Sequence, residues 1–243
     1  MVYLDNAATT AMFPECVDII KKYAVDEFYN PSALYAPALT AAKAVKSARE
    51  KLAAVLGCNA DNIVFTASGS EADNFAIFCG PRRKKGKVII SAVEHAAVFN
   101  SAKALADKGY ELIVAPVDVY GRVLFDEFVN LLDENVVFVS IMHICNETGA
   151  LNDIKRLCGE VRKRCPDAIF HSDGVQAFCK LRFSVKDLGV DLYSVSGHKI
   201  HAPKGIGALY ISLKLNLQPF IYGGGQERNL RFRICCRTHV QRC

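Results

Sequence analysis

Short apolar runs rich in β-branched residues alternate along the chain with longer segments of helical period. Runs of this kind, bounded by Gly, Pro, Asn, Asp or Ser, are typical of buried strands. They predict strands at residues 62–65, 87–90, 111–114, 136–141, 168–171, 191–195 and 205–211.

Segments with apolar residues at helical spacing lie between these runs, and several open with Asp or Ser in the capping position. They predict helices at residues 71–78, 96–108, 126–133 and 153–164, with a longer helical stretch within residues 33–56. The alternation predicts an α/β fold with a mainly parallel, mixed sheet flanked by helices. In such folds ligands bind outside the carboxyl ends of the strands, so the polar residues that follow each strand are the candidates for chemistry.

The segment after the first predicted strand, Thr66 to Asn74, has the outline of a phosphate-binding loop. Small hydroxyl residues, among them Ser70, lead into a helix whose free N–H groups favour an anion, and Gly69 lets the backbone approach it closely. An ordinary serine-capped helix has the same pattern, and the loop alone leaves both interpretations open. The lysine of a P-loop is missing, which argues against a nucleoside triphosphate.

Three further polar residues follow predicted strands. His95 suits stacking on a planar ring, and a hydrogen-bonded structural role is the alternative. Asn146 is a candidate donor to a ring hydroxyl or oxyanion, whereas Cys145 beside it is interpreted as a small buried filler. Asp173 needs a cationic partner if it is buried. A protonated pyridine nitrogen meets that need and becomes a stronger electron sink, while a helix cap is the alternative.

Lys199 follows the strand at 191–195, flanked by Ser196 and His198. The pKa of a lysine falls readily when the amine is desolvated or set beside another cation, and the neutral amine condenses with a carbonyl. A lysine after a strand is more often a solvated surface charge. The combination of phosphate loop, ring stacker, acid, ring-oxygen donor and lysine is more specific than any member, and it predicts a site for pyridoxal phosphate. We predict no metal site.

Composition indicates a globular protein, because 243 residues with 51% hydrophobic content suffice for a large core. The ten cysteines are scattered without a Cys-x-x-Cys pair, so we expect reduced thiols. No apolar run has the length of a membrane span, and the N-terminus lacks a basic region or a cleavage site. We therefore expect a soluble, cytoplasmic protein without membrane association.

Charge is distributed unevenly along the chain. Residues 1–227 hold all 25 acidic residues and an equal number of Lys and Arg, so the net charge of +5 comes from the five arginines from Arg228 onward. A basic tail is compatible with nucleic-acid binding. Residues 232–243 also hold three cysteines and show no periodicity. We interpret them as foreign to the preceding fold and expect no nucleic-acid partner.

The chain resembles the cysteine desulfurases of the class-V aminotransferase family, within the fold-type I pyridoxal-phosphate enzymes. The resemblance spans residues 2–231 and rests on residues 3–10, 30–32, 63–66, 70–74, 94–95, 146–149, 171–173, 196–199 and 223–228. It implies that Lys199 is the catalytic Schiff-base lysine, that Asp173 pairs with the pyridine nitrogen, and that His95 stacks on the ring as a second catalytic residue. It also implies two further sets, with Asn146 and Gln176 near the ring oxygen and Gly69, Ser70, Ser196 and His198 around the phosphate.

The sequence departs from the family pattern mainly at its end. Family members continue beyond the position of Arg231 into a Gly-Thr phosphate contact for the partner subunit and a small domain with the catalytic cysteine and a substrate-binding arginine. None of these is recognisable here. We therefore expect an N-terminal segment (1–12), a cofactor-binding large domain (13–231) and an atypical tail (232–243), with the small domain largely missing.

The resemblance implies a reaction that converts L-cysteine to L-alanine and enzyme-bound sulfur for iron–sulfur clusters or thio-cofactors. It further implies a homodimer and a sulfur-acceptor scaffold protein as partners of intact relatives. We expect this chain to be impaired in that reaction. Two alternatives stay open: a selenocysteine lyase or other class-V enzyme, and a non-catalytic fragment that binds the cofactor or dimerises.

Overall fold

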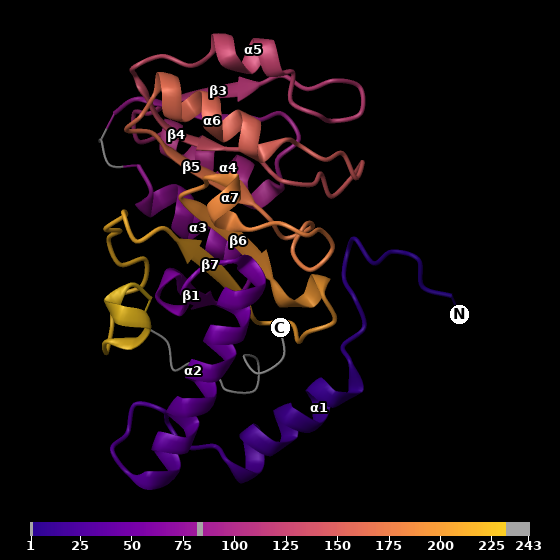
Figure 1. Ribbon diagram of the computed structural model, residues 1–243, viewed down its shortest axis with the longest axis vertical. Coiled ribbons are helices and arrows are strands. Elements are labelled where there is room, and N and C mark those ends of the chain that lie inside the picture. Colours follow the sequence, from indigo (N-terminus) through magenta and orange to yellow (C-terminus); the bar gives the residue numbers. More distant parts are fainter. Residues whose placement is uncertain (1, 82–84, 232–243) are drawn as a thin grey trace.

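The computed structural model describes residues 2–81 and 85–231, with a seven-stranded sheet at its centre (Figure 1). The strands are β1 (Ile63–Thr66), β2 (Lys87–Ser91), β3 (Glu111–Ala115), β4 (Val136–Ser140), β5 (Ile169–Asp173), β6 (Leu192–Ser196) and β7 (Gly207–Ile211). Their order across the sheet is β1-β7-β6-β5-β4-β2-β3. All seven predicted strands are confirmed, and their ends differ from the prediction by no more than two residues.

Strand direction brings the carboxyl ends of most strands to one edge of the sheet. β2 runs parallel to β3 and β4, and β5 runs parallel to β4 and β6. β7 is antiparallel to both of its neighbours, β1 and β6, so β1 points the same way as β6. The predicted mainly parallel, mixed sheet is confirmed, and β7 is the one reversed strand among the seven described.

Helices cover both faces of the sheet, as predicted. One layer consists of α2 (Ala36–Leu56), α5 (Phe125–Asn130), α6 (Ile154–Arg164) and α7 (Val185–Leu188), and the other of α3 (Gly69–Cys79) and α4 (Ala96–Ala106). Successive strand side chains alternate between the layers: Ile63 and Phe65 pack with the first, and Val64 packs with the second. Both faces are therefore buried, which explains the continuous apolar runs of the strands.

Helix α5 ends at Asn130, three residues before its predicted end at residue 133. The Asp133 carboxylate accepts a hydrogen bond from the Asn135 N–H (2.9 Å) and pairs with Lys87 on the neighbouring strand (2.5 Å). These contacts turn the chain into β4 instead of continuing the helix.

Helix α1 (Pro14–Lys21) and the π-helical turn that continues it (Lys22–Asp26) were not predicted. Figure 1 shows α1 and the first part of α2 extending away from the sheet. Cys16 and Tyr23 are the buried residues of this segment. Helix α1 has only eight residues and its N-cap is Phe13, so it lacks the Asp or Ser cap that opens several of the predicted helices.

No helix within residues 2–81 and 85–231 is long and apolar enough to span a membrane. The predicted boundary between residues 12 and 13 stays a prediction. The predicted tail, 232–243, lies outside the described residues.

Candidate functional site

One cavity of about 500 Å³ lies at the carboxyl edge of the sheet and brings together every residue predicted for the site. These residues are Gly69, Ser70, His95, Asn146, Asp173, Gln176, Ser196, His198 and Lys199. They lie at or directly after the ends of five different strands, β1, β2, β4, β5 and β6, which end at the same edge. Parallel strands thus place residues that lie up to 130 positions apart in the sequence, Gly69 to Lys199, around one space.

The loop between β1 and α3 forms one wall of the cavity. Ser68 caps α3, because its hydroxyl accepts a hydrogen bond from the Glu71 N–H at 3.1 Å. A Cβ on Gly69 would lie 2.8 Å from Cγ2 of Val175 and 3.2 Å from Cβ of Ser196, so only glycine fits there without displacement. The backbone therefore comes close to β6 at the start of an eleven-residue helix.

Ser196, the last residue of β6, lines the same cavity and contributes a hydroxyl that has no partner among the described residues. Its side chain is buried, and the residue is 2% exposed. A buried hydroxyl without a partner is costly, and an anionic oxygen at the N-terminus of α3 would satisfy it. The donor set of this wall therefore fits a phosphate group.

An ion pair between Glu71 and Arg231 stabilises the loop between β1 and α3. Oε2 of Glu71 accepts the Ala67 N–H (2.9 Å) and Nη2 of Arg231 (2.8 Å), and Oε1 pairs with Nε of Arg231. The Arg231 side chain is 6% exposed, so this two-point ion pair is largely shielded from water. Sequence reasoning gave neither residue a role in the site.

Asp173 ends β5 and is 5% exposed. Its Oδ1 accepts the Val175 N–H at 2.8 Å, and within the described part of the chain it forms no salt bridge. Burial raises the pKa of the Asp173 carboxyl, against the lowering effects of the Val175 N–H and of the charges of His95 and Lys199. A cationic group in the cavity would relieve the cost of this buried carboxylate.

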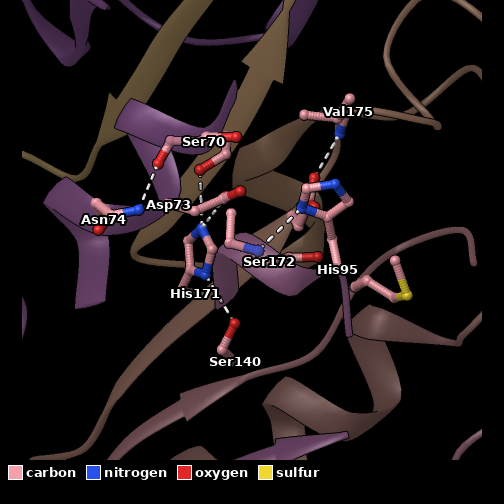
Figure 2. A network of polar contacts seen from close by, with 12 residues as sticks. Ser70, Asp73, Asn74, His95, Ser140, His171, Ser172 and Val175 are labelled. Atoms are coloured by element: carbon pink, nitrogen blue, oxygen red, sulfur yellow. Dashed lines mark hydrogen bonds and ion pairs between the residues drawn. The ribbon is translucent and has the colours of Figure 1, made fainter. Parts of the chain in front are cut away.

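His95 caps α4 and lines the same cavity. Its Nδ1 accepts a hydrogen bond from the Ala97 N–H at 3.1 Å, which leaves Nε2 as the protonated nitrogen of the neutral ring. Figure 2 shows His95 near Val175, on the opposite side of the close-up from His171 and Asp73. The cap holds the imidazole in one orientation, as a ring that stacks on a planar ligand requires.

Lys199 lies in the short 3₁₀ turn Gly197–Lys199 directly after β6. Its Nζ donates hydrogen bonds to the carbonyl oxygens of Ala7 and Ala8, the latter at 2.9 Å. Burial lowers the pKa of the Lys199 amine, and the charges of Asp173 and Asp5 oppose this effect. The lowered pKa increases the fraction of neutral amine, the form that attacks a carbonyl carbon.

Three other predicted residues, Gln176, Asn146 and His198, have partners of their own in this structure. Nε2 of Gln176 donates to Ala7 O, and Nδ2 of Asn146 donates to Glu147 (both 2.8 Å). Nδ1 of His198 lies 3.1 Å from Oγ1 of Thr9, and burial lowers the pKa of its imidazole. These contacts leave all three side chains on the cavity wall.

Sequence reasoning missed several residues of the cavity wall. Asp5, Ala7 and Ala8 belong to the N-terminal segment, which is fixed against the 3₁₀ turn by the hydrogen bond from Thr10 N to His198 O (2.9 Å). Asp73, one turn into α3, also lines the cavity. The N-terminal segment has no strand or helix pattern, so only its match to the family motif at residues 3–10 could have identified it.

The prediction for Cys145 is confirmed: it is 2% exposed and packs with Met142 and Ala150 as a small apolar filler. The seven cysteines of the described residues are all reduced in this structure. None of the seven lines the cavity.

Curated relatives of this chain are named cysteine desulfurases. The chain is 42% identical to the cysteine desulfurase of Trichormus azollae over 233 residues, which cover 95% of the chain and 58% of the relative. It is 41% identical to the cysteine desulfurase IscS of Methanosarcina thermophila, covering 95% and 57%. The chain thus spans slightly more than half the length of the curated relatives it matches.

Solved structures agree with this fold. A NifS-like protein superposes with a TM-score of 0.95 at 34% identity, covering 98% of this chain and 66% of that one. The structure titled SspA in complex with cysteine gives a TM-score of 0.93 at 35% identity, covering 99% and 70%. The strands, the helices and their order therefore match the fold-type I large domain implied by the sequence resemblance.

The family assignment covers nearly the whole chain. The profile of the aminotransferase class-V family matches residues 2–237, a range that holds every wall of the cavity. The fold, the relatives and this match lead to one assignment: the chain belongs to the class-V aminotransferase family.

Proposed function

We propose that this chain binds pyridoxal phosphate in the cavity and forms the cofactor-binding part of a cysteine desulfurase. Enzymes of the class-V aminotransferase family depend on pyridoxal phosphate. The observation that carries the proposal is the pairing, in one cavity, of Lys199, an amine of lowered pKa, and Asp173, a buried acid without a salt-bridge partner in the described part of the chain. Relatives named cysteine desulfurase and a structural neighbour solved with cysteine support the substrate.

The site residues divide the binding task by their chemistry. Asp173 would accept a hydrogen bond from a protonated pyridine nitrogen, and His95 would lie on the face of the ring. Asn146 and Gln176 would donate to the ring oxygen. The phosphate would be held by Gly69, Ser70, Ser196 and His198, where the unpartnered Oγ of Ser196 supplies a free donor.

Lys199 would carry the proton transfers of the reaction. When bound, the cofactor supplies an electron sink that acidifies the α-carbon of an attached amino acid. Nζ of Lys199, neutral in part because burial lowers its pKa, would take the α-proton and return it. The carbonyl oxygens of Ala7 and Ala8 that accept from Nζ would orient the amine and stabilise it after it gains the proton.

Sulfur transfer needs a nucleophilic thiolate that attacks the substrate sulfur and leaves alanine. No cysteine of the described residues lines the cavity. This observation favours a second candidate function, in which the chain binds the cofactor and activates the α-carbon of the substrate without releasing sulfur. We expect a homodimer by analogy with the family, and the molar mass of the cofactor-bound chain in solution tests this.

The test of cofactor binding is reduction with borohydride after addition of pyridoxal phosphate, followed by peptide mapping. We expect the cofactor-derived label on Lys199, with loss of the label in Lys199→Ala. Lys204→Ala is the matched control, because Lys204 is an exposed lysine five positions away and should keep the label. Label on a lysine other than Lys199, or no label on the folded chain, would show that the assignment of Lys199 is wrong.

A further inference from the structure

A second buried carboxyl reaches the cavity beside Asp173. Asp73 is 1% exposed and lines the same cavity. Its Oδ1 is shielded from solvent and has no hydrogen-bond partner among residues 2–81 and 85–231, while the carboxyl receives a hydrogen bond from Ser194. The proposed function uses Asp173 and leaves Asp73 without a role.

The nearest candidate cation for Asp73 is His171, whose Nε2 lies 3.7 Å from Oδ1. Both ring nitrogens of His171 already have hydroxyl partners, Ser194 Oγ at 2.9 Å from Nε2 and Ser140 Oγ at 2.8 Å from Nδ1. Figure 2 shows His171 between Asp73 and Ser140. The imidazole is fully buried, and burial lowers its pKa to about 3. At neutral pH His171 is therefore uncharged and does not neutralise a carboxylate at Asp73.

Around Asp73 the buried carboxyl groups outnumber the cationic side chains that could neutralise them. Glu94 is buried, its Oε1 accepts from Ser91 Oγ (2.6 Å) and Met142 N (2.7 Å), and burial raises its pKa to about 8. The charges of His95 and Lys199 lower the pKa of Asp173. Burial, and next the charge of Asp173, raise the pKa of Asp73. Two buried carboxylates close together cannot both ionise without a large cost.

We propose that Asp73 holds a proton at neutral pH and so leaves Asp173 as the single ionised acid that faces the ring nitrogen of the cofactor. Asp73 is then a positioning residue, which acts through the charge state of Asp173. The role of Asp173 rests on the proposed function, whereas the proton on Asp73 is a property of the folded chain alone. The two are separated by experiment.

The test compares urea unfolding of the full chain and of Asp73→Asn over a series of pH values. Asparagine reproduces the neutral carboxyl, so the native states of both proteins have the same charge. In the unfolded wild-type chain Asp73 ionises above its ordinary pKa of about 3.9. The native wild type thus binds one more proton than the unfolded wild type. Its free energy of unfolding therefore falls relative to that of the variant as pH rises from about 5 to about 7. We expect the ratio of their unfolding constants to change about tenfold per pH unit.

Two controls isolate this effect. Asp126→Asn removes an exposed carboxylate at the start of α5 and should show no such slope. Glu94→Gln should show a slope of its own, because Glu94 has a raised pKa as well. A stability difference between wild type and Asp73→Asn that stays constant with pH overturns the proposal. If Asp73→Asn does not fold, infrared spectra of Glu94→Gln should still contain the carbonyl stretch of a protonated buried carboxyl, and its absence overturns the proposal too.

Binding of pyridoxal phosphate distinguishes failure of this proposal from failure of the proposed function. Equilibrium dialysis of the wild-type chain at neutral pH measures this binding separately from the stability slope. A wild-type chain that shows the stability slope but binds no cofactor refutes the function and keeps the proton on Asp73. A chain that binds cofactor without the slope keeps the function and refutes the role of Asp73.

Discussion

Replacing Arg231 tests whether the ion pair between Arg231 and Glu71 stabilises the fold. Arg231→Met keeps much of the side-chain volume but removes both contacts to Glu71, whose side chain is 15% exposed and keeps the Ala67 N–H. Breaking a buried pair by removing one partner costs about 3–5 kcal/mol. Because Glu71 retains one donor and some access to water, we expect the low end of this range, about 3 kcal/mol.

The assay is urea denaturation of wild type, Arg231→Met, Glu71→Gln and the double variant. The double variant should be more stable than the sum of the single losses implies, because each single change leaves an unpaired group that the second change removes. Glu50→Gln is the control: its pair with Lys46 is 3.9 Å long and its side chain is 53% exposed, so its loss should cost at most about 1 kcal/mol. An Arg231→Met variant as stable as Glu50→Gln would refute the reasoning.

Three further outcomes are expected. Asp173→Ala should still take up the cofactor label on Lys199 but slow the exchange of the substrate α-proton for deuterium, measured by NMR, and unchanged exchange would remove Asp173 from this role. Burial lowers the pKa of His143 to about 4, so the folded chain resists protonation of this imidazole and loses stability as pH falls below about 6.5. His143→Gln should therefore reduce the loss of unfolding free energy at acid pH, measured by urea denaturation. An unchanged loss would contradict the buried neutral imidazole. With cofactor present, the chain should yield little sulfide and alanine from cysteine, compared with a chimera that carries the end of a full-length desulfurase after Arg231. Robust production of both by the unmodified chain would refute the proposal that it activates the α-carbon without releasing sulfur.

Local patterns in the sequence determined most of the fold. Continuous apolar runs such as 136–141 identified the strands, because both faces of the sheet are covered by helices, and all five residues of β4 are buried. The same order of strands and helices placed Gly69, Asp173 and Lys199 at strand ends. These positions lie at one edge because the strands they follow run in the same direction.

Tertiary structure alone decided which partners the buried charges have. Asp73, Glu71 and Arg231 have ordinary helix or loop positions in the sequence, and their importance comes from contacts with residues far along the chain, such as the 160 positions between Glu71 and Arg231. Sequence periodicity reports the burial of whole faces, whereas the energy of a carboxyl group depends on the few atoms within hydrogen-bonding distance. The sequence therefore determined where the site lies, and folding determined the charge that each acid in it carries.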